Sequence, residues 1–490
     1  MRWAESRIRV AALLTCFSCS CDRAGNADQE GTREVNRNSV MNVGVEAGGT
    51  QVVAHAGLHA LGRFADRIGL GASLSTAIPW SGERAPLHDR GTVLTHTMLM
   101  LAAGGEACSD IEFLAPQSRL FGAVASDSTL YRTMRAITPS VLADLAAQAA
   151  VTRAQVWRRM AATTGTGMVV LDIDASLVQI HSENKAGTGP NYKGGFGFHP
   201  LFCFADATGE ALAAMLRPGS AAANTVADHF SVLDAAVAQL PAEIAVGHHP
   251  GDEKSMVRRR VQVRTDSAGC STRFVAGCRS RNIGFAVVAR SNASIHKGIS
   301  RIQHDNKRWQ PARRRSGDPA QRSHVAEITD LVDLSRWPAG TRLIVRREHL
   351  HQGAQRSLFP SLCYRYWGHY TDADGSPVEL DAHMRDHAHV EDHIKRLKDS
   401  GLERFPFTNL DANRAWMQLV CLGADLVRWF QQLCCTGELA TAEPKRLRWS
   451  MWHTPARIVR RAGRDIIRII DGWPTTTDLL DAHRHITAIC

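Results

Sequence analysis

The sequence has no apolar run of about 18 residues, the length that a helix needs to cross a bilayer. We therefore expect no membrane partner and a cytoplasmic protein. The 12 cysteines show no repeated spacing, which excludes a zinc-finger array and a disulfide scaffold. Gly187-Thr188-Gly189 and Gly194-Gly195 are not followed by Gly-Lys-Ser or Gly-Lys-Thr, so a nucleotide-binding loop of that type is also excluded.

Positive charge stands out against an otherwise ordinary globular composition. The 490 residues carry a net charge of +10, with 44% hydrophobic and 22% charged residues. This length allows two to four domains and at least one sizeable core. The excess of positive charge favours a polyanionic partner, such as nucleic acid or an anionic membrane surface.

The hydrophobic pattern changes its period at Gly167. Residues 52–160 show helical spacing, whereas short apolar runs alternate with helical stretches after Gly167. The predicted strands are Met168–Asp174, Phe196–Phe204, Glu210–Arg217, Arg260–Asp266 and Gly284–Arg290, with helices at Asn224–Leu240 and 271–281. A three-stranded meander followed by helix, strand, helix and strand is the element order of ribonuclease-H-like folds. We therefore predict an α/β fold with a ribonuclease-H-like mixed five-stranded sheet and helices.

The same pattern predicts a β-rich insertion that interrupts this fold and a small helical domain that precedes it. The segments are a disordered tail or over-extended start (1–45), a helical N-terminal DNA-binding domain (46–160), the first part of the catalytic domain (161–299), the β-rich insertion (300–380), the second part of the catalytic domain with a glutamate helix (381–440) and a basic C-terminal region (441–490).

Acidic residues occupy the positions where such a sheet would bring them together. Asp172 and Asp174 are two residues apart on one strand, so their side chains share a face. Asp266 ends the neighbouring fourth strand, and Glu391 lies on a predicted helix. Clustered carboxylates repel one another unless cations neutralise them, and their oxygens suit Mg²⁺ or Mn²⁺. These acids predict a site for two metal ions, which can activate a water or a 3′-hydroxyl for phosphoryl transfer.

Each of these acids also has a second interpretation. Asp172 could be the metal ligand instead of Asp174, or it could orient a ligand. Asp266 could cap the helix that follows it. Glu391 could be a surface acid that pairs with Lys395 four residues later.

Five longer motifs follow one another in a fixed order through these segments. They are Leu171-Asp172-Ile173-Asp174-Ala175-Ser176, Gly195-Phe196-Gly197-Phe198-His199-Pro200-Leu201, Leu216-Arg217-Pro218-Gly219-Ser220, Arg264-Thr265-Asp266-Ser267-Ala268-Gly269 and Val390-Glu391-Asp392-His393-Ile394. Together they resemble the motifs of DDE transposases of bacterial insertion sequences, in particular the insertion-sequence-1380 type. The resemblance extends from about Val52 to Trp473.

The resemblance implies a role for each of four residues. Asp174, Asp266 and Glu391 would be the catalytic residues and would hold two Mg²⁺ or Mn²⁺ ions per active site. Lys398, seven residues after Glu391 and therefore on the same helix face, would contact a DNA phosphate near the cut.

Two positions depart from the family pattern. Related transposases carry Tyr and Arg where this chain has Met384 and His387, so the resemblance does not supply a DNA-positioning role at these places. His387 and Asp172 are instead candidates for residues that orient the metal ligands without binding the ions themselves.

Basic residues cluster in the predicted insertion and near the C-terminus, where they could neutralise DNA phosphates or simply form a solvated cationic face. The arginines predicted to bind DNA are Arg313, Arg314, Arg315, Arg457, Arg460 and Arg461.

We expect a cut-and-paste transposase that cleaves DNA at terminal inverted repeats and transfers the strand into target DNA. The resemblance implies double-stranded DNA as the partner and at least a homodimer on DNA. A hydrolytic nuclease of the same fold and an inactive, transposase-derived DNA-binding protein are the alternatives.

Overall fold

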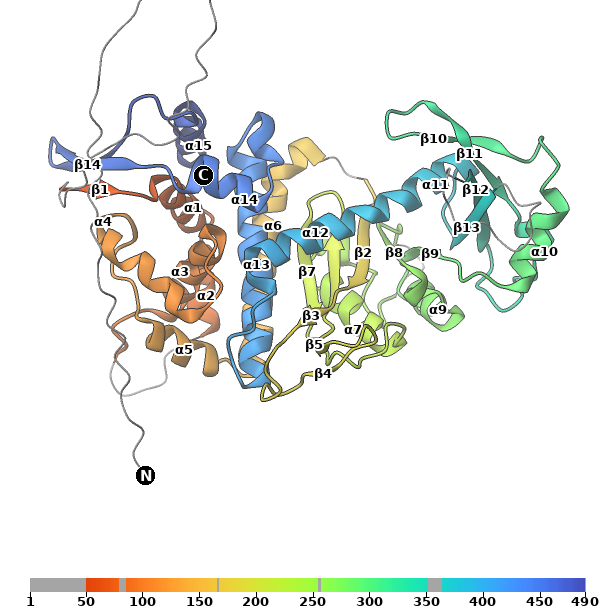
Figure 1. Cartoon of the computed structure of the whole chain (residues 1–490), viewed down its shortest axis with the longest axis horizontal. Coiled ribbons are helices and arrows are strands. Elements are labelled where there is room, and N and C mark those ends of the chain that lie inside the picture. Colours follow the sequence, from red (N-terminus) through yellow and green to blue (C-terminus); the bar gives the residue numbers. More distant parts are fainter. Residues whose placement is uncertain (1–49, 79–84, 165–166, 254–256, 351–363, 490) are drawn as a thin grey trace, which may run out of the picture. The chain divides into compact units, whose positions relative to one another are not determined.

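Figure 1 shows the computed structural model of the chain, which describes residues 50–78, 85–164, 167–253, 257–350 and 364–489. The predicted tail or over-extended start at 1–45 lies outside these ranges. By their contacts, residues Gln51–Cys490 form one unit. Within the described ranges, none of the helices has the length and apolar character that crossing a membrane requires.

A large mixed sheet contains four of the five predicted strands and part of the other, and this confirms a mixed α/β fold. The five strands are β2 (Val169–Ala175), β6 (Leu201–Ala205), β7 (Glu210–Met215), β8 (Val261–Thr265) and β9 (Gly284–Val288). Their order in the sheet is β7-β6-β2-β8-β9. Strands β2, β8 and β9 run parallel, while β6 and β7 are antiparallel to their neighbours.

The second predicted strand, Phe196–Phe204, is divided in two. Its first part is β5 (Phe196–Phe198), which joins β3 (Val178–Gln179) and β4 (Gly189–Pro190) in a separate three-stranded sheet. Pro200 lies between β5 and β6, and proline has no backbone N–H to donate to a strand ladder. The break in the strand therefore falls beside a residue that cannot continue the pairing.

The predicted insertion is β-rich, but its strands extend the same sheet, so within the described part of the chain the sheet has nine strands and not five. The added strands are β10 (Gln310–Arg313), β11 (Pro319–Glu327), β12 (Arg342–His349) and β13 (Tyr364–Thr371), preceded by α10 (Ala293–Ile302). They join through β13, which pairs antiparallel with β9 and places Thr371 opposite Ala286. A five-stranded sheet would leave β9 as an open edge, and β13 occupies that edge.

The alternation of residues along β2 assigns a different environment to each face of the sheet. Leu171 and Ile173 pack in a buried cluster with residues of α7 (Val226–Val237) and α9 (Thr272–Ser280). Asp172 and Asp174 belong to the other face, because successive side chains of a strand point in opposite directions. That face carries α11 (Pro377–Arg385), α12 (His389–Leu397) and α13 (Leu410–Cys434).

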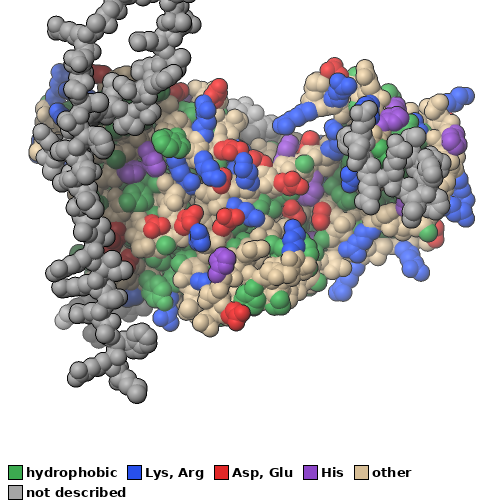
Figure 2. All heavy atoms as spheres, in the orientation of Figure 1, with side chains coloured by type: hydrophobic (Ala, Val, Ile, Leu, Met, Phe, Trp, Pro, Cys, Tyr) green, Lys and Arg blue, Asp and Glu red, His purple; other side chains and the backbone are tan. Residues whose placement is uncertain are grey.

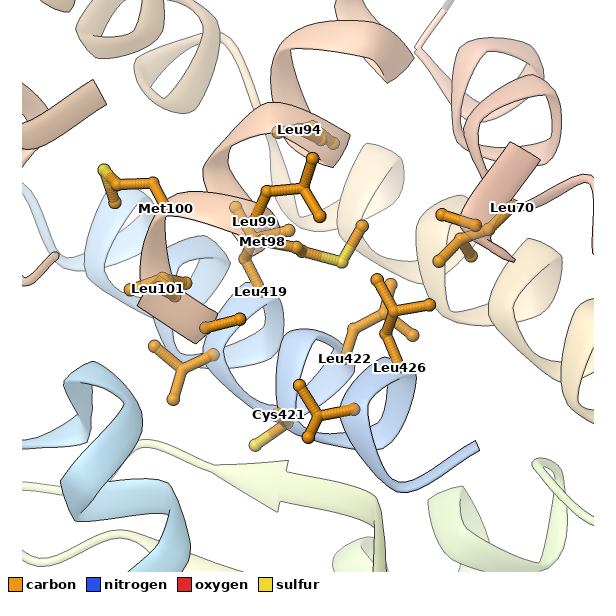
Figure 3. Close-up of a cluster of buried hydrophobic side chains, with 14 of the residues drawn as sticks. Leu70, Leu94, Met98, Leu99, Met100, Leu101, Leu419, Cys421, Leu422 and Leu426 are labelled. Atoms are coloured by element: carbon orange, nitrogen blue, oxygen red, sulfur yellow. The ribbon is translucent and has the colours of Figure 1, made fainter. Parts of the chain in front are cut away.

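The helices predicted for residues 46–160 are present and share their core with C-terminal helices. They are α1 (Ala56–Arg67), α2 (Leu70–Ala77), α3 (Arg90–Ala103), α4 (Ser118–Phe121), α5 (Asp127–Arg135) and α6 (Pro139–Thr164). Figure 3 shows Leu94 and Met98 of α3 facing Leu419 and Leu422 of α13. The remaining elements are α8 (Ala242–Ala245), α14 (Pro444–Leu447), α15 (Thr476–Ala488), β1 (Val52–Val53), β14 (Ala456–Arg461) and β15 (Arg464–Ile469).

A buried charged cluster connects the helical core to the sheet. Arg153 of α6 donates to Glu210 of β7 at 2.9 Å and to Asp425 of α13 at 2.6 Å. Trp157 and Trp429 donate their indole N–H groups to Glu210, each at 2.6 Å. Burial and the charge of Glu210 raise the pKa of Asp425 to about 7, against the opposing effect of Arg153. One arginine thus forms ion pairs with two buried carboxyl groups.

Candidate active site

Asp172 is fully buried and neutralised by its neighbours. Arg264 of β8 donates to its two carboxylate oxygens at 2.8 Å and 2.6 Å, and His387 Nδ1 lies 2.7 Å from Oδ1. Burial alone would raise the pKa of Asp172, but the hydrogen bonds from His387 and Arg264 hold that pKa below its ordinary value. Both oxygens therefore have protein partners, and Asp172 organises its surroundings.

Arg264 is a functional residue that sequence reasoning missed. Its guanidinium contacts Asp172, Asp206 at 2.9 Å and the backbone carbonyl of His383 at 2.6 Å. Its side chain is 1% exposed. These contacts connect β2, the turn after β6 and α11. The available signal was an arginine inside an otherwise apolar or uncharged strand, since a buried charge requires a partner.

Asp174 and Asp266 lie at the carboxyl ends of adjacent parallel strands. The register pairs Asp172 with Arg264 and Ile173 with Thr265, so Asp174 and Asp266 come next on the two strands. Burial, together with the negative charges of Asp266 and Glu391, raises the pKa of Asp174 to about 6, against the opposing effects of a hydrogen bond from the Ala175 N–H and the charge of His387. The three acids therefore share one electrostatic environment.

The second interpretations of Asp266 and Glu391 have different outcomes. Asp266 accepts a hydrogen bond from the Ala268 N–H at 2.8 Å and caps a single 3₁₀ turn, while Ser271 caps α9. Capping is therefore one role of Asp266. The sequence alternative for Glu391 was pairing with Lys395, but Lys395 forms its ion pair with Glu443 at 2.6 Å.

The three acids lack the cations that Asp172 has. Among the described residues, no lysine, arginine or histidine lies within ion-pair distance of Asp174, Asp266 or Glu391. The same part of the chain contains no group of three His, Cys, Asp or Glu side chains already gathered closely enough to hold a metal ion. The negative charges of Asp266 and Glu391 act on Asp174, and the opposing charge of His387 comes from a side chain that is hydrogen-bonded to Asp172.

A polar cleft of about 600 Å³ begins at Ala175, the residue after Asp174. Its wall includes Ala175, which follows Asp174, and Lys398, whose Nζ lies 3.5 Å from the Leu177 carbonyl oxygen. Lys193 and the 75% exposed Tyr192 also line this cleft. The cleft combines positive charge with an exposed aromatic ring.

The predicted DNA-binding arginines lie on two hairpins outside this cleft. Arg313 ends β10, and Arg314 and Arg315 lie in the exposed turn before β11. Figure 2 shows Lys and Arg side chains around this hairpin and α10. The other three lie on β14, where Arg460 is opposite Asp465 of β15. Met384 is buried in α11.

The fold and the site define a class of α/β protein in which acids stand at the carboxyl ends of two adjacent parallel strands. Residues 35–489 match the family model described as Transposase DDE domain group 1. The chain belongs to this family of DDE transposases.

Comparisons with individual proteins add less. No curated protein matches the chain. Among solved structures, a piggyBac transposase synaptic complex with hairpin DNA, determined by electron cryo-microscopy, is similar to it. The sequence identity is 11% and the TM-score 0.39, and the match covers 82% of this chain and 80% of that chain.

Proposed function

We propose that this chain is a cut-and-paste transposase of a bacterial insertion sequence, of the insertion-sequence-1380 type. Its reaction would be divalent-metal-dependent cleavage at terminal inverted repeats, followed by strand transfer into target DNA. Family membership supports the transposase class. The observation that carries the catalytic assignment is the mutual repulsion of Asp174, Asp266 and Glu391, which lack ion-pair partners among the described residues.

The strand order supports a ribonuclease-H-like catalytic core as part of this proposal. In β7-β6-β2-β8-β9, the first strand of the core lies at the centre, beside the fourth. This order brings Asp174 and Asp266 to one edge of the sheet although 92 positions separate them in sequence. Glu391 comes from α12, which packs against β2, and its charge raises the pKa of Asp174.

The donor set fits a hard divalent cation. All three candidate ligands are carboxylates, which Mg²⁺ and Mn²⁺ prefer over the nitrogen and sulfur ligands typical of zinc. Asp174, Asp266 and Glu391 would hold two ions, and neutralisation would draw the three carboxylates closer together than their repulsion allows. When bound, such ions supply activation of an attacking water or 3′-hydroxyl and charge stabilisation at the leaving oxygen.

The protein's own residues would orient the acids and the DNA. Arg264 and His387 hold Asp172, which fixes β2 and β8 at the point where Asp174 and Asp266 follow. Lys398, on the wall of the cleft beside Asp174, would contact a phosphate near the cut.

The two basic hairpins would bind duplex DNA farther from the reacting phosphate. The arginines in this proposal are Arg313, Arg314 and Arg315 on one hairpin and Arg457 and Arg461 on the other. Arg460, which the sequence analysis also predicted to bind DNA, lies on the opposite strand face from Arg461 and pairs across the hairpin with Asp465, so this proposal does not include it. The protein would act on inverted repeats and target DNA as at least a homodimer, because two element ends must be brought together.

A cleavage assay on DNA carrying the element's ends tests this function. The full chain should nick that fragment with Mn²⁺ and not with EDTA, and D266N should abolish nicking while its DNA affinity persists. Pre-cut ends offered with a target plasmid then separate the alternatives. Joined products support a transposase, nicking without joining indicates a hydrolytic nuclease, and metal-independent DNA binding without nicking indicates an inactive descendant.

A further inference from the structure

Strands β14 and β15 form a hairpin with a tight turn, which we call the ribbon. At its base β1 pairs with Ala456 and Arg457 of β14, so the sheet has three strands there and two strands towards the turn. They pair antiparallel from Ala456 opposite Ile469 to Arg461 opposite Arg464. The turn consists of Ala462 and Gly463, with φ of 48° and 75°. Two central residues with positive φ match the right-handed twist of the flanking strands. In Figure 1 the ribbon is found by the label β14, beside β1.

One face of the ribbon is attached to the helical core. Ala456 and Ile458 are each 1% exposed and pack with Val53, Ala56 and Leu120 in a small apolar cluster. The only acid on the ribbon, Asp465, lies on this same face opposite Arg460, and it pairs with Arg119 of α4 at 2.7 Å. The inner face therefore holds the apolar contacts and the acid.

The outer face carries four arginines around an aliphatic pair. Along the strands the cross-strand pairs on this face are Arg457 with Arg468, Val459 with Ile466, and Arg461 with Arg464. All four arginines are exposed, and Ile466 is 41% exposed. Among the described residues, none of these four arginines forms an ion pair.

This arrangement is unfavourable for the isolated chain. Like charges directly opposite each other destabilise a strand pair, and this ribbon has two such pairs on one face with no acid between them. Acidic or neutral residues opposite these arginines would keep the hairpin soluble at a lower electrostatic cost. The outer face is therefore built for a partner with closely spaced negative charges.

We propose that the outer face of this ribbon lies across the major groove of duplex DNA, with one arginine pair at each phosphate backbone. The two pairs are four residues apart, or about 13 Å along the ribbon. That separation is close to the groove width of about 12 Å, and the groove admits a two-stranded ribbon. Val459 and Ile466 then face the groove floor. This inference rests on the proposed function for the identity of the polyanion.

Salt-dependent DNA binding by the full chain tests the ribbon. The probe is a fluorescent 30-base-pair duplex, and anisotropy titrations are run in EDTA at several salt concentrations. Each lost phosphate contact should lower the slope of log affinity against log salt by about 0.9. We expect R461Q to lower the slope by about one, and R461Q/R464Q by about two.

Neighbouring arginines on opposite faces give a matched control. R460Q removes the same charge one residue away from Arg461, and R484Q removes an exposed arginine of α15. Both should leave the slope within a few tenths of wild type. Equal losses from R460Q and R461Q would overturn the proposal, because a diffuse positive field would then explain binding. An unchanged slope in R461Q/R464Q would also overturn it.

Two further readouts separate this inference from its alternatives. Melting temperatures of the outer-face variants should equal or exceed wild type, because like-charge pairs are relieved; a fall would assign the arginines a structural role. Binding to phosphatidylserine vesicles with the same dependence on Arg461, but no duplex dependence, would contradict DNA as the partner. Since the titration needs no cleavage, loss of Mn²⁺-dependent nicking leaves the ribbon's result intact, and the reverse also holds.

Discussion

Two clusters of carboxylates in this molecule handle their repulsion in opposite ways. Glu210 and Asp425 are buried together, and Arg153 lies between them with hydrogen bonds to both. Asp174 feels the charges of Asp266 and Glu391, and no arginine takes the corresponding place among the described residues. Because Arg153 is part of the protein, the cluster of Glu210 and Asp425 is permanently neutralised and connects the helical core to the sheet.

The difference teaches how a fold can keep a place for an exchangeable ion. In both clusters burial raises the pKa of one carboxyl group, Asp425 to about 7 and Asp174 to about 6. Protein charge compensates the first cluster at all times. The second cluster is completed only when a cation from solution binds, and this makes its charge available for chemistry.

The largest expected effect comes from removing one acid of the uncompensated cluster. D266N should lower the rate of Mn²⁺-dependent DNA cleavage by about 10³-fold or more, the size typical of losing a group that acts as part of a catalytic unit. Its free energy of unfolding should not fall, because less repulsion remains in the folded state. Cleavage kinetics and urea denaturation measure both quantities.

The matched control for D266N is E112Q, an acid removed from an exposed position. It should leave cleavage and stability unchanged. A D266N protein that cleaves within tenfold of wild type would show that the uncompensated acids are not the catalytic group.

The compensated cluster should respond in the opposite sense. R153M leaves Glu210 and Asp425 buried without their cation, and breaking such a pair costs about 3–5 kcal/mol of unfolding free energy. The triple variant R153M/E210Q/D425N should recover part of that loss, because no uncompensated charge remains. Urea denaturation of the three proteins checks the prediction, and a loss below about 1 kcal/mol for R153M would show that this connection is unimportant.

Asp172 tests the boundary between the two kinds of cluster, since it shares a strand face with Asp174 but has its own cations. D172N weakens the hold on Arg264 and His387, and we expect cleavage to fall by about 10–100-fold, as for residues that orient metal ligands. D174N should cost clearly more. If D172N is the more damaging substitution, Asp172 is the ligand and the two roles are exchanged.

The smallest effect is a pH dependence of metal-activated cleavage. Because the pKa of Asp174 is raised to about 6, a proton competes with the cation below that pH. At subsaturating Mn²⁺, activity should rise about tenfold per unit as the pH approaches 6 and level off above it. Without metal, this group's contribution to stability has the opposite trend, since its folded pKa exceeds its ordinary value of 3.8. That contribution declines as the pH rises from about 4 to about 6.

A pH series at two Mn²⁺ concentrations provides the check. Saturating Mn²⁺ should shift the rise to lower pH, because the cation displaces the proton. A profile that is flat between pH 5 and 7 at low Mn²⁺ would contradict the assignment of Asp174 as a ligand that must first ionise.

The sequence predicted the positions of the acids better than it predicted their partners. Hydrophobic periodicity located β2 and β8 to within about a residue, and strand alternation placed Asp172 and Asp174 on one face. Arg264 and Asp206 became visible only in the fold, because their contacts join residues that are distant in sequence. Arg153 is similar, since nothing in the sequence distinguishes it as buried from Arg158 and Arg159 of the same helix.

The number of strands in the sheet could not be predicted from local sequence patterns either. The β-rich character of residues 300–380 was predicted, but the place of these strands in the main sheet depends on β13 pairing with β9. Likewise, the helices of residues 46–160 could be predicted, whereas their shared core with α13 depends on contacts across more than 250 positions. Long-range pairing, not local propensity, decides both features.

Binding of Mn²⁺ measured by electron paramagnetic resonance tests most directly whether Asp174, Asp266 and Glu391 form one cation site. The account predicts that wild-type protein removes Mn²⁺ from the free-ion signal and that D174N, D266N and E391Q each weaken this binding strongly, while R153M/E210Q/D425N does not. Wild-type affinity retained in E391Q would contradict it, because the helix would then contribute nothing to the site at the sheet edge.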